Sequence, residues 1–75
     1  MIYKKLDARG LQCPLPILRT HKAMRGVSVG DVLIVLTTDP GSVDDFVAFC
    51  DSEGHALLDK KIHQDYFQFT IQCKK

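Results

Sequence analysis

A cysteine followed closely by two prolines is the part of this sequence best suited to chemistry. Cys13 is followed directly by Pro14, and Pro16 comes two residues later. The residues after them have the composition of a helix, so Cys13 lies at a predicted helix entry. The N-terminus of a helix carries a partial positive charge, which favours a thiolate over a thiol. Because the thiolate is the nucleophilic form, Cys13 is the first candidate for a reactive group.

The two prolines predict that Cys13 is held in a rigid and partly exposed backbone position. Neither has an N–H, so in the first helical turn only Leu15 and Ile17 are left to donate hydrogen bonds toward Cys13. Pro14 fixes the backbone angle of the first helical position if the helix begins there. Pro16 disfavours the helical conformation of Leu15, so a start at Pro16 is the alternative.

Basic and apolar residues lie close to the cysteine. Arg9, Arg19 and Lys22 are the nearest cations in the sequence that could stabilise a thiolate or its persulfide. Arg19 and Lys22 share the outer face of the predicted helix with Leu15 and Leu18. A basic face is often only a solvated face, but exposed leucines among the cations are typical of a docking surface. We expect Leu15, Leu18, Arg19 and Lys22 to contact a partner protein.

The other two cysteines are predicted to be packing residues. Cys50 falls in the apolar stripe of a helix, and Cys73 lies on the apolar side of the last strand. Three cysteines without a CxxC pair argue against a disulfide framework. Cys50 and His55 are the only close Cys/His pair, too few ligands for zinc, so we expect neither a metal nor a cofactor. His63 and His55 are read as ordinary strand-end residues.

Length and charge exclude several classes of protein. The chain has 75 residues, which we interpret as one domain over residues 1–75. Ten basic and nine acidic residues nearly balance, which disfavours nucleic-acid binding. The N-terminus has no apolar run behind its charges, so we do not expect a signal peptide. No segment approaches the ~20 apolar residues of a membrane span. We expect a cytoplasmic protein that is a monomer or a weak dimer.

Hydrophobic periodicity predicts six elements in the order β-α-β-α-β-β. Strands are expected at 2–7, 32–36, 55–63 and 66–73, and helices at 14–25 and 42–53. The unbroken apolar run 32–36 indicates a strand buried on both sides, whereas the last strand alternates apolar and polar residues. The fold class is therefore an α/β (α+β) two-layer sandwich, a mixed four-stranded sheet with both helices on one face.

The helices are expected to bury one stripe each. In the first helix this stripe holds Pro16, Ile17, Thr20, Ala23, Met24 and Val27. In the second it holds Val43, Phe46, Val47 and Cys50, with Asp39 or Ser42 placed to cap the helix. The acidic residues of the second helix, Asp44, Asp45, Asp51 and Glu53, are assigned to its outer face, where the first two complement the helix dipole.

The run Asp7–Pro16 resembles the signature of the TusA/SirA-like small sulfur carriers, whose mark is Cys-Pro-x-Pro at the start of the first helix. The resemblance extends over essentially the whole chain. It includes the turn at Val29–Asp31, the loop Thr38–Ser42 and the helix end at Gly54–His55. The family fold is the same two-layer sandwich reached above from periodicity.

The resemblance implies a sulfurtransferase component that carries a persulfide on Cys13, with Pro14 and Pro16 as structural prolines. A cysteine desulfurase or rhodanese-type protein would supply the sulfur, and a downstream acceptor protein would receive it. Family members serve tRNA thiolation, molybdenum cofactor biosynthesis or sulfur oxidation, and some relatives are linked to selenium. Leu15 stands where the carrier of the tRNA relay has an acidic residue, and the chain ends Cys73-Lys74-Lys75 where many members carry an arginine.

Two other functions stay open from the residues alone. The first is a regulatory module that binds a protein through the basic, leucine-bearing helix face and does no sulfur chemistry. The second is an RNA contact through the same patch, which the near-zero net charge disfavours. Hydrolysis is not expected, because the sequence has no local histidine base, Ser/His/Asp pattern or phosphate-binding loop.

Overall fold

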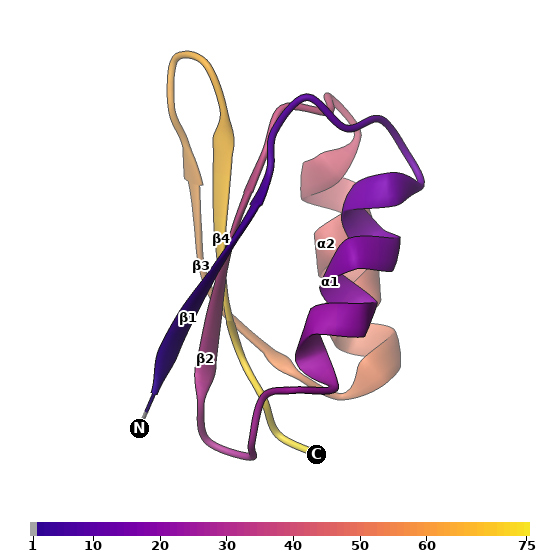
Figure 1. Ribbon diagram of the computed structural model, residues 1–75. Coiled ribbons are helices and arrows are strands. Elements are labelled where there is room, and N and C mark those ends of the chain that lie inside the picture. The colour runs from indigo at the N-terminus through magenta and orange to yellow at the C-terminus, as the bar shows by residue number, and fades with distance from the viewer. Residues whose placement is uncertain (1) are drawn as a thin grey trace.

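The computed structural model describes residues 2–75 and contains the six expected elements. They are β1 (Tyr3–Ala8), α1 (Leu15–Met24), β2 (Val32–Thr37), α2 (Ser42–Glu53), β3 (Ala56–Ile62) and β4 (Phe67–Gln72). The strands form one sheet in the order β1-β2-β4-β3, and both helices cover the same face of it (Figure 1). The predicted mixed two-layer sandwich is confirmed.

β2 lies inside the sheet and is its most buried strand, as its apolar sequence predicts. It pairs in parallel with β1 and antiparallel with β4, with Val35 opposite Leu6 on one side and Phe69 on the other. Five of its six residues are buried. β4 alternates as expected: Phe69 and Ile71 face the helices, while Gln68 and Thr70 stay partly exposed on the open face.

The core lies between the sheet and the two helices. Phe46 of α2 stacks on Phe69 of β4, with ring centroids 4.5 Å apart and planes within 6° of parallel. Both rings are fully buried, and Leu33 and Val35 pack in the same cluster. Offset or stacked aromatic pairs of this kind add to the stabilisation that burial alone provides. This contact packs α2 against the centre of the sheet.

α1 buries the predicted stripe. Pro16, Thr20 and Met24 face the sheet, and the Thr20 hydroxyl donates a 2.8 Å hydrogen bond to the carbonyl of Pro16. The helix begins at Leu15, with Pro14 as its N-cap residue, so Leu15 adopts the helical conformation despite the proline that follows it. Packing of the buried stripe outweighs the local preference of a residue before proline.

Two expectations for α2 are wrong. Its N-cap is Gly41 without a side-chain cap: Asp39 instead accepts the N–H of Gly41 at 3.2 Å, and Ser42 is buried inside the helix. Val47, assigned to the buried stripe, is 43% exposed, whereas Phe49 is buried. The larger Phe49 side chain reaches toward α1 and takes the place between the helices, which turns Val47 outward.

The end of α2 is determined by Gly54. This residue has φ +75°, a left-handed conformation that L side chains rarely adopt, and the N–H of His55 bonds to the Cys50 carbonyl at 2.9 Å. No helix within residues 2–75 is long and apolar enough to cross a bilayer. In the same part of the chain, no three acidic, cysteine or histidine side chains cluster as metal ligands would.

Candidate functional site

Cys13 differs from the other cysteines in its exposure. It lies in the loop between β1 and α1 and is exposed, whereas Cys50 is 3% and Cys73 1% exposed. Burial raises the pKa of the Cys50 thiol to about 11. The Cys13–Pro14 peptide bond is cis. The structure therefore presents one cysteine to other molecules and keeps two in the core, as the sequence predicts.

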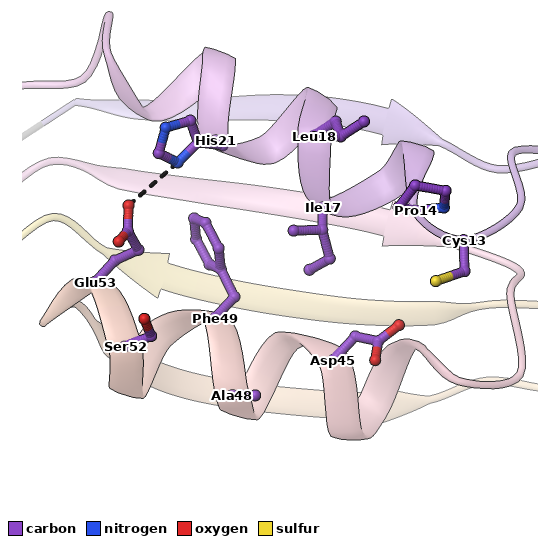
Figure 2. Close-up of a pocket in the computed structure, with 10 residues that line it drawn as sticks. All are labelled: Cys13, Pro14, Ile17, Leu18, His21, Asp45, Ala48, Phe49, Ser52 and Glu53. Atoms are coloured by element: carbon purple, nitrogen blue, oxygen red, sulfur yellow. Dashed lines mark ion pairs between the residues drawn. The ribbon is translucent and has the colours of Figure 1, made fainter.

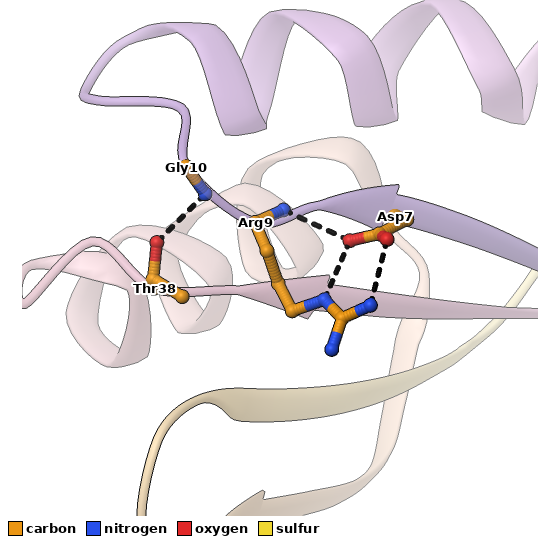
Figure 3. Close-up of polar contacts among 4 residues, drawn as sticks. All are labelled: Asp7, Arg9, Gly10 and Thr38. Atoms are coloured by element: carbon orange, nitrogen blue, oxygen red, sulfur yellow. Dashed lines mark hydrogen bonds and ion pairs between the residues drawn. The ribbon is translucent and has the colours of Figure 1, made fainter.

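The loop that carries Cys13 is tied to the neighbouring loop after β2. The backbone N–H of Gly10 donates a 2.9 Å hydrogen bond to the Thr38 hydroxyl (Figure 3). Gly10 has φ +84°, which explains a glycine at this turn. The Leu11 N–H also returns to the Ala8 carbonyl at 3.3 Å. These contacts hold the segment before Cys13 against the carboxyl ends of β1 and β2.

Arg9 does not serve Cys13 in the way its place in the sequence indicates. Its guanidinium binds Asp7 through two hydrogen bonds of 2.9 Å (Figure 3). The same guanidinium lies over the Tyr66 ring, 5.5 Å from the ring centroid. The hydrogen bonds from Arg9 hold the pKa of the Asp7 carboxyl down at about 2. Arg9 thus braces the end of β1, and the expected stabilisation of a Cys13 thiolate by this residue is not seen.

A groove of about 580 Å³ runs between α1 and α2, with Cys13 at one end (Figure 2). Its walls are mainly apolar, because Ile17 and Leu18 on one side and Ala48 and Phe49 on the other line its middle. The lining residues from the Cys13 side are Cys13, Pro14, Ile17, Leu18 and His21. Those from α2 are Asp45, Ala48, Phe49, Ser52 and Glu53.

The other end of the groove is closed by a histidine–carboxylate pair. His21 Nδ1 lies 3.1 Å from Glu53 Oε1, and the imidazole meets the Phe49 ring edge-on at 6.2 Å (Figure 2). Its partner is Glu53, so the imidazole is held at the far end and away from the sulfur.

A second, more polar hollow of about 380 Å³ lies on the opposite side of Cys13. The loop before α1 and the loop between β2 and α2 form it, and its lining residues are Gly10, Leu11, Gln12, Cys13, Thr38, Asp39 and Pro40. Cys13 is shared by the two hollows. A group attached to its sulfur therefore has space on both sides.

The electrostatic surroundings of Cys13 differ from the prediction. The pKa of the thiol lies above its ordinary value, because nearby atoms partly desolvate the thiolate and because the carboxylates of Asp45 and Asp39 oppose negative charge. The Leu15 N–H, expected to face the sulfur, bonds instead to the Gln12 carbonyl at 2.8 Å. The expected lowering of this pKa by the helix end is thus overturned.

The predicted partner-binding residues are exposed as a group, but they divide into two sets. Leu15 is 43% and Leu18 56% exposed, and Arg19 and Lys22 are exposed beside them on α1. Only Leu18 lines the groove that leads to Cys13. Leu15, Arg19 and Lys22 lie outside both hollows around the sulfur.

Sequence reasoning missed the contribution of α2 to this site. Asp45 and Phe49 line the groove with Ser52, at spacings of four and three residues that put them on one helical face. Pro14, Ile17, Leu18 and His21 repeat that spacing on α1. This spacing is present in the sequence, but acidic residues on a helix indicate an outer face, so the pattern alone does not place Asp45 in the groove. Which faces of two helices meet is decided by how both dock on the sheet.

The chain is similar to known proteins over most of its length. Residues 4–73 match the family described as Sulfurtransferase TusA. A putative sulfur carrier protein of Neisseria meningitidis is 51% identical over 69 residues, which cover 92% of this chain and 93% of the relative. The sulfur carrier protein TusA of Allochromatium vinosum is 49% identical, with 92% and 91% covered.

The fold has a solved counterpart as well. The crystal structure of a SirA-like protein from Desulfitobacterium hafniense superposes with a TM-score of 0.82, covering 96% of this chain and 99% of that one. The two sequences are 23% identical, so this likeness concerns the fold. The two-layer architecture is shared over nearly the whole of both chains.

Proposed function

The chain belongs to the TusA family of sulfur carriers, and we propose that it accepts a sulfur atom as a persulfide on Cys13 and passes it to an acceptor protein. The observation that carries this proposal is the position of Cys13. It is the exposed thiol among three cysteines, and hollows on both sides leave room for an added sulfur. The two buried cysteines have no such access.

The chemistry requires no external oxidant. The Cys13 sulfur attacks the terminal sulfur of a donor persulfide; a new S–S bond forms, the old one breaks, and the donor leaves as a thiol. In the second step a nucleophile of the acceptor attacks the terminal sulfur of the Cys13 persulfide, and the Cys13 thiol is released. Each step replaces one S–S bond by another, so the transfer involves no net oxidation or reduction. An accessible thiol and two docking partners are therefore sufficient.

Donor and acceptor are proposed by chemical class. A cysteine desulfurase or a rhodanese-type protein supplies a cysteine-bound persulfide, and a downstream protein receives it for tRNA thiolation, molybdenum cofactor synthesis or another sulfur-trafficking pathway. Pro14 and Pro16 hold Cys13 at the entry of α1. Leu15, Leu18, Arg19 and Lys22 form the partner-binding face, which their exposure on α1 supports.

Loading by a donor tests the proposal. The protein is incubated with a cysteine desulfurase and cysteine, and its intact mass is measured before and after treatment with dithiothreitol. We expect the mass of one added sulfur atom, lost on reduction and absent in Cys13→Ala. An unmodified wild-type protein, with a desulfurase shown to load a known carrier in parallel, would overturn the proposal.

A further inference from the structure

The groove between the helices and the carboxylates beside Cys13 point to one kind of partner. We propose that the groove binds a protein segment that places an apolar side chain between α1 and α2 and an arginine or lysine against Asp45, next to its own sulfur-bearing cysteine. This inference rests on the proposed function, because it describes how a donor or acceptor would reach Cys13.

The groove has an apolar wall that a partner's side chain can cover. Leu18, Ile17 and Phe49 line the groove, and Leu18 is 56% exposed in the free protein. A volume of about 580 Å³ lies within the ~300–1,000 Å³ of typical ligand sites, enough for a few side chains of a peptide. Covering Leu18 with an apolar side chain removes both from water, which favours binding.

The end of the groove at Cys13 carries negative charge. Asp45 and Asp39 flank Cys13, and within residues 2–75 neither carboxylate forms an ion pair. Figure 2 shows the Asp45 carboxylate and the Cys13 sulfur pointing toward one another. Neither the guanidinium of Arg9, which is bound to Asp7, nor Arg19 or Lys22 lines the hollows beside Cys13.

Sulfur transfer requires a negative charge on the sulfur of Cys13. A thiolate or persulfide anion at Cys13 would face these carboxylates with like charge, which slows transfer in the free protein. A cation from the partner pairs with Asp45 and stabilises the sulfur anion at the same time. The charge needed for transfer therefore arrives with the partner, which restricts transfer to proteins that carry it.

Activated peptides test this recognition without an identified partner. The probe is a short peptide whose cysteine is a 2-thiopyridyl disulfide, with leucine two positions before the cysteine and arginine directly after it. Cys13 attacks the peptide sulfur, a protein–peptide disulfide forms, and pyridine-2-thione leaves and is measured by absorbance. Three further peptides replace the leucine by serine, the arginine by glutamate, or both. Cys13→Ser provides the blank.

We expect the leucine–arginine peptide to react fastest. The arginine peptide should exceed the glutamate peptide by about five- to tenfold at low salt. This ratio should fall to about twofold or less in Asp45→Asn, and stay unchanged in Asp44→Asn, which alters the neighbouring exposed carboxylate outside the groove. The leucine preference, about fivefold, should be lost in Leu18→Ser and kept in Val47→Ser, an exposed position of α2 outside the groove.

Three results with the peptides would overturn the inference. They are equal rates for all four peptides, a preference for glutamate, and a charge preference that survives in Asp45→Asn. Dimerisation of the free protein that is abolished by Leu18→Ser would assign the groove to a second copy and overturn it too. Persulfide loading on the same samples separates the two proposals: loading without peptide preference overturns this inference alone, and absent loading overturns the proposed function.

Discussion

Cys13 and Asp45 come from different elements and meet at one end of the groove between α1 and α2. Cys13 ends the loop after β1, and Asp45 lies in the first turn of α2, with its carboxylate aimed at the sulfur (Figure 2). Desolvation and this carboxylate together raise the pKa of the thiol. The thiolate of Cys13 is therefore less favoured in the free protein than the thiolate of an ordinary exposed cysteine.

Removing the Asp45 charge should make Cys13 more reactive near neutral pH. In Asp45→Asn the neighbouring carboxylate no longer opposes the thiolate, so the pKa of Cys13 falls and the rate of alkylation by iodoacetamide rises at lower pH than in wild type. Carboxylates are ionised throughout the range pH 6–10. A pH–rate profile followed by intact mass gives the midpoint for each protein.

The matched control for that profile is Asp44→Asn. Asp44 precedes Asp45 in the same helical turn, but it is exposed and lies outside the groove. Its removal changes the net charge equally and should leave the midpoint where it is in wild type. Equal shifts in both variants would show that only net charge acts on the thiol.

Cys13 should be modified far faster than the other two cysteines in the folded protein. Cys73 is 1% exposed, and the pKa of Cys50 is raised to about 11 by burial. At pH 7.5 we expect about 100-fold faster alkylation at Cys13, read by peptide mapping after short exposure to iodoacetamide. In 8 M urea, as a control, the three rates should converge. Comparable rates in the folded state would contradict the burial of Cys50 and Cys73.

The stacked phenylalanines should dominate the stability of α2 on the sheet. Phe46→Leu removes the ring that stacks on Phe69 at 4.5 Å and leaves space in a fully buried site. We expect a loss of about 1–3 kcal/mol in the free energy of unfolding. Val47→Ala, next to it but 43% exposed, should cost less than about 1 kcal/mol. Urea unfolding followed by circular dichroism measures both, and a reversed order would contradict the packing described.

The hydrogen bond between Gly10 and Thr38 should hold the Cys13 loop in place. Thr38→Val keeps the shape of the side chain and removes the acceptor of the Gly10 N–H. We expect a cost of about 0.5–1.5 kcal/mol in unfolding free energy, together with faster amide hydrogen exchange at Gly10. Thr70→Val, on the open face of β4, is the control. Unchanged exchange at Gly10 would show that the loop is held by other contacts.

The fold could be predicted well from the sequence, because the hydrophobic periodicity and the positions of glycine and proline indicate the same helix and strand boundaries along the chain. The apolar run 32–36 can only be a buried strand in so short a chain, and Gly54 ends the second helix where its conformation requires glycine. The exposure of Cys13 follows similarly from the two prolines that lift it away from the core face of α1.

The surroundings of Cys13 could not be predicted in the same way. Asp45 is 32 residues away in the sequence, and only the docking of both helices on one sheet face brings its carboxylate to the sulfur. Arg9, only four residues away, turns instead to Asp7 and Tyr66. Residues near Cys13 in the sequence therefore predict a positive charge beside the sulfur, whereas the structure places a carboxylate there. Tertiary packing, not distance along the chain, determines which groups surround this loop.

Delivery of sulfur by the isolated, loaded protein tests the account most directly. The protein is loaded with ³⁵S from labelled cysteine by a desulfurase, separated from the donor, and mixed with a panel of sulfur-acceptor proteins. We expect label to leave Cys13 and appear in equal amount on at least one acceptor, and no label to be taken up by Cys13→Ala. Label that is held equally by Cys13→Ala, or that stays on the wild-type protein with every acceptor in the panel, would contradict the claim that Cys13 carries sulfur between proteins.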